Sequence, residues 1–148
     1  MKQVIISLVI GLFFSLYSYS QTLQIFGGQK HNIYLGCLNC SNLETESIWN
    51  VQGNYGNSQQ SKSIWNAKGI YGSVNSNYSP WNALAKYPPV LKDNNGEFYG
   101  YLSTNDVNGY RADFTLAKKL YESHKLIKLD VANWYNKIFD KNLADKSN

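Results

Sequence analysis

Cys37 and Cys40 are the only two cysteines of the chain, and their Cys-x-x-Cys spacing suits three kinds of chemistry. In an oxidising compartment such a pair forms a structural disulfide. Two thiolates can instead ligate a metal ion, or one thiol of lowered pKa can exchange disulfides. Residues three positions apart in an extended strand lie about 10 Å apart at Cα, whereas a disulfide needs less than about 7 Å. A bridge therefore requires the chain to turn at Leu38 and Asn39; otherwise the thiols stay unbridged or pair between molecules.

A metal site would need ligands beyond these two thiols. His31 and His124 are the only histidines, and two thiolates with two imidazoles would suit Zn²⁺. His31 falls on the same predicted hairpin as the cysteines, so the alternative metal set is Cys37, Cys40 and His31. His124 is expected to be a partly exposed residue of a helix. We expect the structural disulfide and no cofactor, with zinc as the alternative.

Three copies of a sixteen-residue pattern occupy the middle of the chain, over 41–56, 57–72 and 73–88. The first two copies share the motif S-I-W-N-x2-G-x-Y-G, and the third replaces its isoleucine and both glycines. A fixed period predicts one structural unit used again, with each copy packed on the next. We expect Trp49, Trp65 and Trp81 to form a buried ladder. Whether the units form coils of a solenoid or stacked turns stays open.

The repeats also carry side chains suited to binding a ligand. Tyrosine rings can stack on sugars or bases while asparagines donate hydrogen bonds, although asparagines at these positions can instead close Asx turns. The candidate ligand-binding residues are Tyr55, Tyr71, Tyr87, Asn50, Asn66 and Asn82. The sequence has no nucleophile elbow, phosphate-binding loop or His-Glu-x-x-His helix, and no paired carboxylates on one predicted face. A binding or structural module is therefore expected rather than an enzyme.

Two related segments flank the repeats, and both are predicted to be β-hairpins. They span residues 25–38 and 90–102, and Asn95-Gly96 provides a turn signal in the second. Gly36 and Gly100 occupy matching places 64 residues apart, which is four sixteen-residue periods. We expect the two hairpins to pair into one small antiparallel sheet, with the repeat loops between them.

Helical periodicity follows the second hairpin. Apolar residues at helical spacing predict helices at about 113–124 and 131–140, with Asp130 as the N-cap of the second. The predicted fold is a single α+β domain over residues 21–148. It comprises a small antiparallel sheet from two related β-hairpins, sixteen-residue aromatic repeat loops, and two C-terminal helices on one face.

The N-terminus is typical of a secretory signal peptide. Lys2 precedes an apolar run from Val4 to Tyr17, and Ser18 and Ser20 place small residues before a cleavage site at Gln21. The run is shorter than the roughly 20 residues of a spanning helix, so we expect residues 1–20 to be removed and no membrane span to remain. Thirteen basic and ten acidic residues then give a formal charge of +3. The lysines are scattered, so no nucleic-acid partner is expected.

The repeat motif, followed by P-P-V-L-x-D-x2-G-x-F-x-G-Y-L, resembles the pattern of a loose group of short exported bacterial proteins. The resemblance covers Ile25 to about Asn105. That group is uncharacterised, so the resemblance implies no particular activity. The signal, together with abundant Lys, Asn and Ile, is typical of a Gram-negative bacterium, so we expect a periplasmic or secreted location. We expect an exported non-catalytic binding or structural module of the cell envelope, with a glycan or another envelope component as its partner. The alternative is a metal-binding or thiol-active protein.

Overall fold

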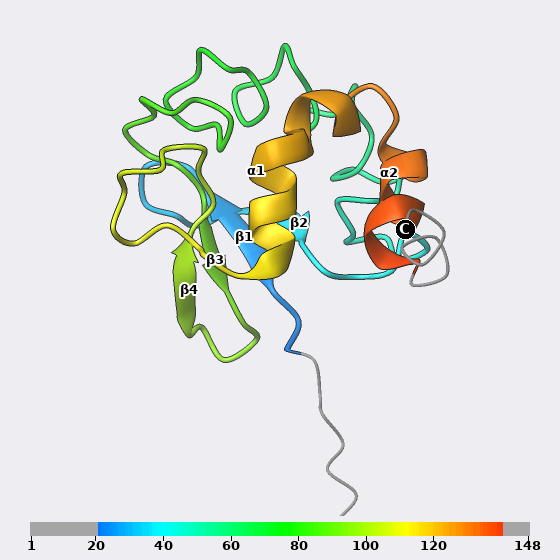
Figure 1. Ribbon diagram of the computed structural model, residues 1–148, viewed down its shortest axis with the longest axis horizontal. Coiled ribbons are helices and arrows are strands. Elements are labelled where there is room, and N and C mark those ends of the chain that lie inside the picture. Colours follow the sequence, from blue (N-terminus) through cyan, green and yellow to red (C-terminus); the bar gives the residue numbers. More distant parts are fainter. Residues whose placement is uncertain (1–20, 141–148) are drawn as a thin grey trace, which may run out of the picture.

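The computed structural model describes residues 21–140, so the signal peptide predicted over residues 1–20 lies outside the described residues. It confirms the predicted α+β fold: two hairpins form a four-stranded antiparallel sheet, and two helices follow at the C-terminal end (Figure 1). Among the described residues, no helix is long and apolar enough to cross a membrane. The elements are β1 (Gln24–Gly27), β2 (Ile33–Cys37), β3 (Val90–Lys92), β4 (Phe98–Tyr101), α1 (Thr115–Ile127) and α2 (Val131–Phe139).

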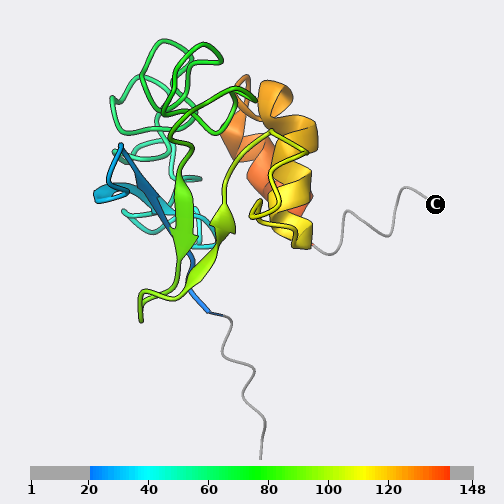
Figure 2. The same ribbon diagram turned by 90° about the vertical axis from the view of Figure 1, so that its left-hand side faces the viewer.

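The sheet has the strand order β2-β1-β3-β4, so the two hairpins join through their first strands. Ile25 of β1 pairs with Leu91 of β3, and both side chains are fully buried. Figure 2 shows both helices on the same side of this sheet. Apolar side chains from the strands therefore have helices to pack against, which is how an antiparallel sheet with one covered face is stabilised.

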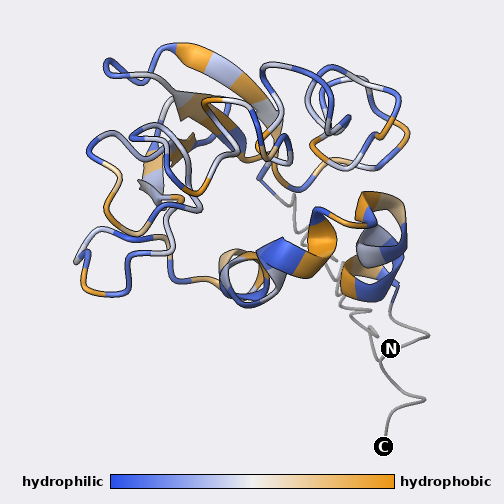
Figure 3. Cartoon of the chain, turned by 90° about the horizontal axis from the view of Figure 1, so that it is seen from above, coloured by the Kyte–Doolittle hydropathy of each residue, from blue (hydrophilic) through white to orange (hydrophobic). Residues whose placement is uncertain are grey.

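The two helices begin and end close to the predicted limits. Asp130 caps α2 as expected, because its Oδ1 accepts a hydrogen bond from the Asn133 backbone amide at 3.1 Å. In α1 the predicted inner face is largely buried, with Ala117 and Leu120 fully enclosed. Figure 3 shows hydrophobic and hydrophilic residues side by side on both helices, as expected for amphipathic helices, while the repeat coils are mostly hydrophilic or neutral.

Each repeat unit is a coil of successive β-turns without helix or strand. In the second unit, backbone amides of Gln60, Ser63, Asn66 and Gly69 each donate to the carbonyl three residues earlier, at 3.0–3.2 Å. Consecutive coils are joined by tryptophan side chains. Trp65 Nε1 donates to the carbonyl of Ile48 in the previous coil, at 2.6 Å. The units are therefore stacked coils, linked by one indole hydrogen bond per step.

The tryptophans form the buried ladder that was expected. The ring centroids of Trp49 and Trp65 are 5.6 Å apart, and those of Trp65 and Trp81 are 5.4 Å apart. Phe139 of α2 packs edge-on against Trp49 at one end, at 5.5 Å. At the other end His124 of α1 stacks on Trp81 at 4.8 Å, with the rings almost parallel. The two helices thus close both ends of the ladder.

His124 corrects one prediction. It was expected to be partly exposed, but only 8 % of its surface is accessible, because its ring occupies the place of a fourth ladder residue. Its Nδ1 lies 2.9 Å from the Tyr121 carbonyl oxygen, so this nitrogen carries the proton. Helical periodicity placed His124 on the inner face but could not show that an aromatic stack ends there.

Residues 105–112 form a partial fourth coil that sequence reasoning missed. In each half of the molecule, the last residue of a hairpin donates its amide to a carbonyl nine positions later and accepts from an amide eleven positions later. The residues involved are Cys37, Glu46 and Ile48 in the first half, and Tyr101, Tyr110 and Ala112 in the second, at distances of 2.6–3.1 Å. The second segment lacks a tryptophan, so its motif is invisible to pattern matching.

Candidate functional site

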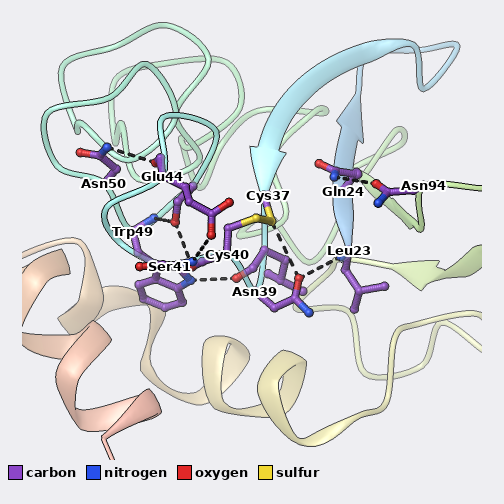
Figure 4. The surroundings of a disulfide bond; sticks show 12 residues. Leu23, Gln24, Cys37, Asn39, Cys40, Ser41, Glu44, Trp49, Asn50 and Asn94 are labelled. Carbon is purple, nitrogen blue, oxygen red and sulfur yellow. Dashed lines mark hydrogen bonds between the residues drawn. A yellow bond between two sulfur atoms is a disulfide. The ribbon is translucent and has the colours of Figure 1, made fainter. Parts of the chain in front are cut away.

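The Cys37–Cys40 disulfide is present, as expected, with the Cα atoms 5.6 Å apart (Figure 4). Strand β2 ends at Cys37, and the chain turns through Leu38 and Asn39 so that the two sulfurs meet. The Leu38 carbonyl accepts the hydrogen bond of Trp49 Nε1 at 2.8 Å. The disulfide loop therefore supplies the carbonyl on which the first tryptophan of the ladder is anchored.

The side chain of Asn39 holds this loop against the start of the described chain. Its Oδ1 accepts from the Leu23 amide at 2.9 Å (Figure 4). Its Nδ2 donates to the Gln21 carbonyl at 2.7 Å. Both of these hydrogen bonds go to backbone groups. The surroundings of the disulfide are those of a structural brace.

His31 does not join the cysteines. It lies in the turn between β1 and β2, at the opposite end of β2 from Cys37, with a backbone φ of 49°. Its Nε2 lies 3.0 Å from the Pro88 carbonyl oxygen, and its ring packs edge-on against Tyr101. Within residues 21–140, no group of three or more metal-ligating side chains comes together. The structure thus does not assemble the alternative metal set of Cys37, Cys40 and His31.

The repeat asparagines close Asx turns inside their own coils. Each Oδ1 accepts from the amide two residues later at 3.0 Å, and each Nδ2 donates to the carbonyl six residues earlier at 3.0–3.1 Å. This set comprises Asn50, Asn66 and Asn82. Because their side chains are already hydrogen-bonded on both sides, they define the shape of each coil.

The repeat tyrosines reach from their coils to the first hairpin. Tyr55 packs edge-on against Tyr34 of β2, with centroids 5.1 Å apart. Tyr71 lies over Gly27 of β1 so closely that a Cβ there would come within 3.0 Å of its ring. Burial raises the pKa of both repeat tyrosines.

Tyr87 makes a third link of this kind. Gln29, in the turn after β1, donates to its hydroxyl at 3.3 Å, and its ring stacks on Tyr78 at 5.5 Å. The structure therefore brings the three predicted tyrosines together along one hairpin, where they join the repeats to the sheet.

A concavity of about 510 Å³ lies between the second repeat unit and the first hairpin; we call it the repeat groove. Its apolar surface is formed by Ile33, Ile70 and Tyr71, and the first two are 36 % and 56 % exposed. Lys62 and Lys68 also line it, and no aspartate or glutamate does. The repeat groove thus combines exposed apolar surface with uncompensated positive charge.

Two smaller hollows of about 200 Å³ adjoin the repeat groove and are likewise free of acidic lining residues. One lies beside Tyr55 and shares Lys62, and the other lies beside Trp65 and shares Lys68. Lys128 at the end of α1 borders the second hollow and donates from Nζ to the Gly72 carbonyl at 2.6 Å. Burial lowers the pKa of Lys128 to about 8.

The charged side chains that line the repeat groove are lysines, and the lining includes no histidine, cysteine or carboxylate. Sequence reasoning identified two of its residues, Asn66 and Tyr71, but missed Ile33, Ile70 and the lysines. Ile33 precedes the repeats, and the other three stand at positions whose residue type changes from one repeat unit to the next. Comparisons with protein-family models, curated proteins and solved structures found no match to this chain.

Proposed function

We propose that this protein is an exported, non-catalytic binding module of the bacterial cell envelope, and that its repeat groove binds an acidic envelope polysaccharide. Support for export comes from the signal-like sequence at residues 1–20. The observation that carries the ligand proposal is the repeat groove itself, where Ile70 and Tyr71 lie beside Lys62 and Lys68 and no acidic side chain is present.

The chemistry of an acidic sugar matches this lining. The apolar face of a sugar ring can pack on the exposed side chains of Ile33 and Ile70, while its carboxylate or phosphate group pairs with a lysine. A neutral sugar would use only the apolar surface and leave both lysines solvated. The ligand is therefore expected to need a negative charge.

The proposed binding should be weak per sugar and strong per chain. An exposed lysine–carboxylate pair contributes only about 0–1 kcal/mol, and salt screens it. The adjoining hollows extend the same basic surface along the second coil. A polymer that contacts several lysines at once therefore gains affinity with length, by raising the effective concentration of each further contact.

The test is titration of the purified protein with oligogalacturonides and with neutral chitin oligomers of equal length. Binding of the acidic series should strengthen with length and weaken with salt. The Lys62→Gln, Lys68→Gln double variant should lose about 2–10-fold in affinity, and Ile70→Ser should lose affinity for every sugar bound. Lys119→Gln, an exposed change on α1 outside the repeat groove, removes one positive charge and is the control.

Equal binding of neutral and acidic oligomers, or an equal loss in the Lys119→Gln control, would rule out the acidic ligand. Absence of binding to either series would rule out the glycan site altogether. Substituting the three repeat tyrosines would be a poorer test, because Tyr55, Tyr71 and Tyr87 join the repeats to the first hairpin. Such a variant would report on stability as well as on binding.

A further inference from the structure

A second open site lies in the other half of the molecule, around Arg111, the only arginine in the sequence. A concavity of about 370 Å³ opens between the partial fourth coil and the first turn of α1. Figure 2 shows this loop running from β4 to the start of α1. The residues that line the concavity are Asp106, Asn108, Gly109, Arg111, Asp113 and Lys118. None of them belongs to the repeat groove.

The guanidinium of Arg111 is fixed in place by stacking. Its Cζ lies 3.9 Å from the ring centroid of Tyr121, and that ring is held because its hydroxyl donates to the Ala112 carbonyl at 3.0 Å. The Arg111 backbone is fixed as well, through a hydrogen bond from its amide to the Asn108 carbonyl and a bridge to Tyr101. Arginine stacked on an aromatic face keeps the N–H edge of its planar fork available for a ligand.

No carboxylate of the described chain neutralises this guanidinium. The ion pair found within residues 21–140 joins Lys118 Nζ to Asp113 Oδ1 at 2.8 Å, so the charge of Asp113 is already matched. Asp106 remains as a second, separate carboxylate in the lining. Apart from its contact with Tyr121, the Arg111 guanidinium forms no ion pair within residues 21–140, and neither does Asp106. The charges of the four ionisable side chains that line the concavity sum to zero.

We propose that this site binds a free amino acid as its zwitterion, with the ligand carboxylate on Arg111 and the ligand ammonium group on Asp106. A fixed guanidinium fork accepts a carboxylate through two parallel hydrogen bonds, a geometry that lysine does not offer. The balanced lining disfavours polyanions, which distinguishes this site from the repeat groove. The exposed backbone at Gly109, where an added Cβ would contact nothing within 4 Å, leaves room for a ligand side chain.

The experiment is isothermal titration of the purified protein with alanine, alaninamide and N-acetylalanine. Alaninamide lacks the carboxylate and N-acetylalanine lacks the ammonium group, so each removes one half of the proposed recognition. Alanine should bind at least about tenfold more tightly than either derivative, since each loses hydrogen bonds to a charged group. Phenylalanine and lysine, tested in the same way, report how much of the cavity the ligand side chain uses.

Two variants complete the test. Arg111→Lys keeps the charge but removes the fork and should weaken alanine binding about tenfold or more. Asp106→Asn, an exposed loop change, should weaken the binding of alanine and leave the binding of N-acetylalanine unchanged. This variant tests the proposal even if Arg111→Lys does not fold. The Lys62→Gln, Lys68→Gln variant should bind alanine like the parent. Binding of N-acetylalanine as tight as that of alanine, or no alanine binding at millimolar concentration, would overturn the proposal.

Discussion

The two halves of this molecule share one backbone design and use it differently. In each half a hairpin is followed by a coil that returns to the last residue of the hairpin through the same pair of main-chain hydrogen bonds. Gly36 and Gly100 lie where the returning coil passes over the last strand of each hairpin, which we call the crossing points, and they have φ of 107° and 114°. At both, an added Cβ would lie within 3 Å of neighbouring atoms. The shared design is thus set by glycine and by backbone hydrogen bonds.

The side chains attached to this design differ in almost every respect. In the first half, Cys40 closes a disulfide and the coil leads into the tryptophan ladder. In the second half the equivalent position is Thr104, whose buried Oγ1 has no hydrogen-bond partner among the described groups. There the coil leads into α1 and forms the polar cavity around Arg111. The same backbone design therefore carries a disulfide in one half and an open cavity in the other.

The largest effect is expected in the tryptophan ladder of the first half. Trp65 is the middle ring of the ladder and 1 % exposed, so Trp65→Ala should lower the free energy of unfolding by about 3–5 kcal/mol. Thermal or urea unfolding measures this loss. Tyr110→Ala removes a ring that is 74 % exposed and is the control, expected to change stability by less than about 0.5 kcal/mol. A Trp65 variant that melts within a degree or two of the parent would show that the ladder does not stabilise the fold.

The equivalence of the two crossing points can be tested directly. Gly36→Ala and Gly100→Ala should each cost about 2–4 kcal/mol, because each combines a positive φ with a steric clash. Gly96→Ala separates these causes, since Gly96 has a φ of 82° but no atom within 4 Å of an added Cβ. It should cost only about 1–2 kcal/mol. Unfolding measurements that give Gly36 and Gly100 very different costs would refute a common design.

The disulfide should contribute less than the ladder that it anchors. It closes a very short loop between Cys37 and Cys40, so it removes little entropy from the unfolded chain. We expect the Cys37→Ser, Cys40→Ser variant to fold and to lose about 1–2 kcal/mol in denaturant unfolding. Stoichiometric zinc in protein purified without chelators would instead support the metal-binding alternative. A disulfide-exchange activity lost on Cys37→Ser alone would support the thiol-active one.

The smallest effect concerns His124 of α1, which stacks on Trp81 at the end of the ladder. Burial lowers the pKa of His124 below its usual value of 6.5, and the neighbouring charges of Lys128 and Lys125 lower the pKa further. Below about pH 6.5 the unfolded chain then binds more protons than the folded one, so stability decreases as the pH falls and levels off once His124 also protonates in the folded state. His124→Phe keeps a ring on Trp81 without this titration.

Melting temperatures of the parent and of His124→Phe between pH 7.5 and 5 measure that contribution. The carboxylates contribute equally to both proteins, so the difference between the two slopes belongs to His124. The parent should lose more stability on acidification than the variant does. Parallel curves would mean that His124 is protonated as easily in the folded state as in the unfolded one.

The sequence predicted the parts of this fold that rest on local signals. Both hairpins, their pairing into one sheet, the Asp130 cap and the burial of the tryptophans were expected from periodicity and turn residues. The disulfide was expected from the compartment, although extended geometry argued against it until the chain was seen to turn at Leu38. These features depend on residues close in the sequence or on a strict repeat.

What the sequence did not predict depends on contacts between distant segments. Ile33 and Ile70 form one apolar surface only because a hairpin turn lies against the second coil. The stacking of Arg111 on Tyr121 likewise needs α1 to fold back over the partial fourth coil. No spacing rule connects such pairs, so both candidate sites became visible only in three dimensions.

The central position of β1 has a consequence for the order in which the chain can fold. Its partner strand β3 lies far along the sequence, since Ile25 pairs with Leu91, 66 positions later. Contacts of such separation form slowly, whereas each hairpin and each turn of the coils can close locally. A growing chain that has not yet delivered β3 therefore holds β1 with one edge unpaired. Such an edge can pair with other chains, so protection from aggregation begins only when Val90–Lys92 has docked.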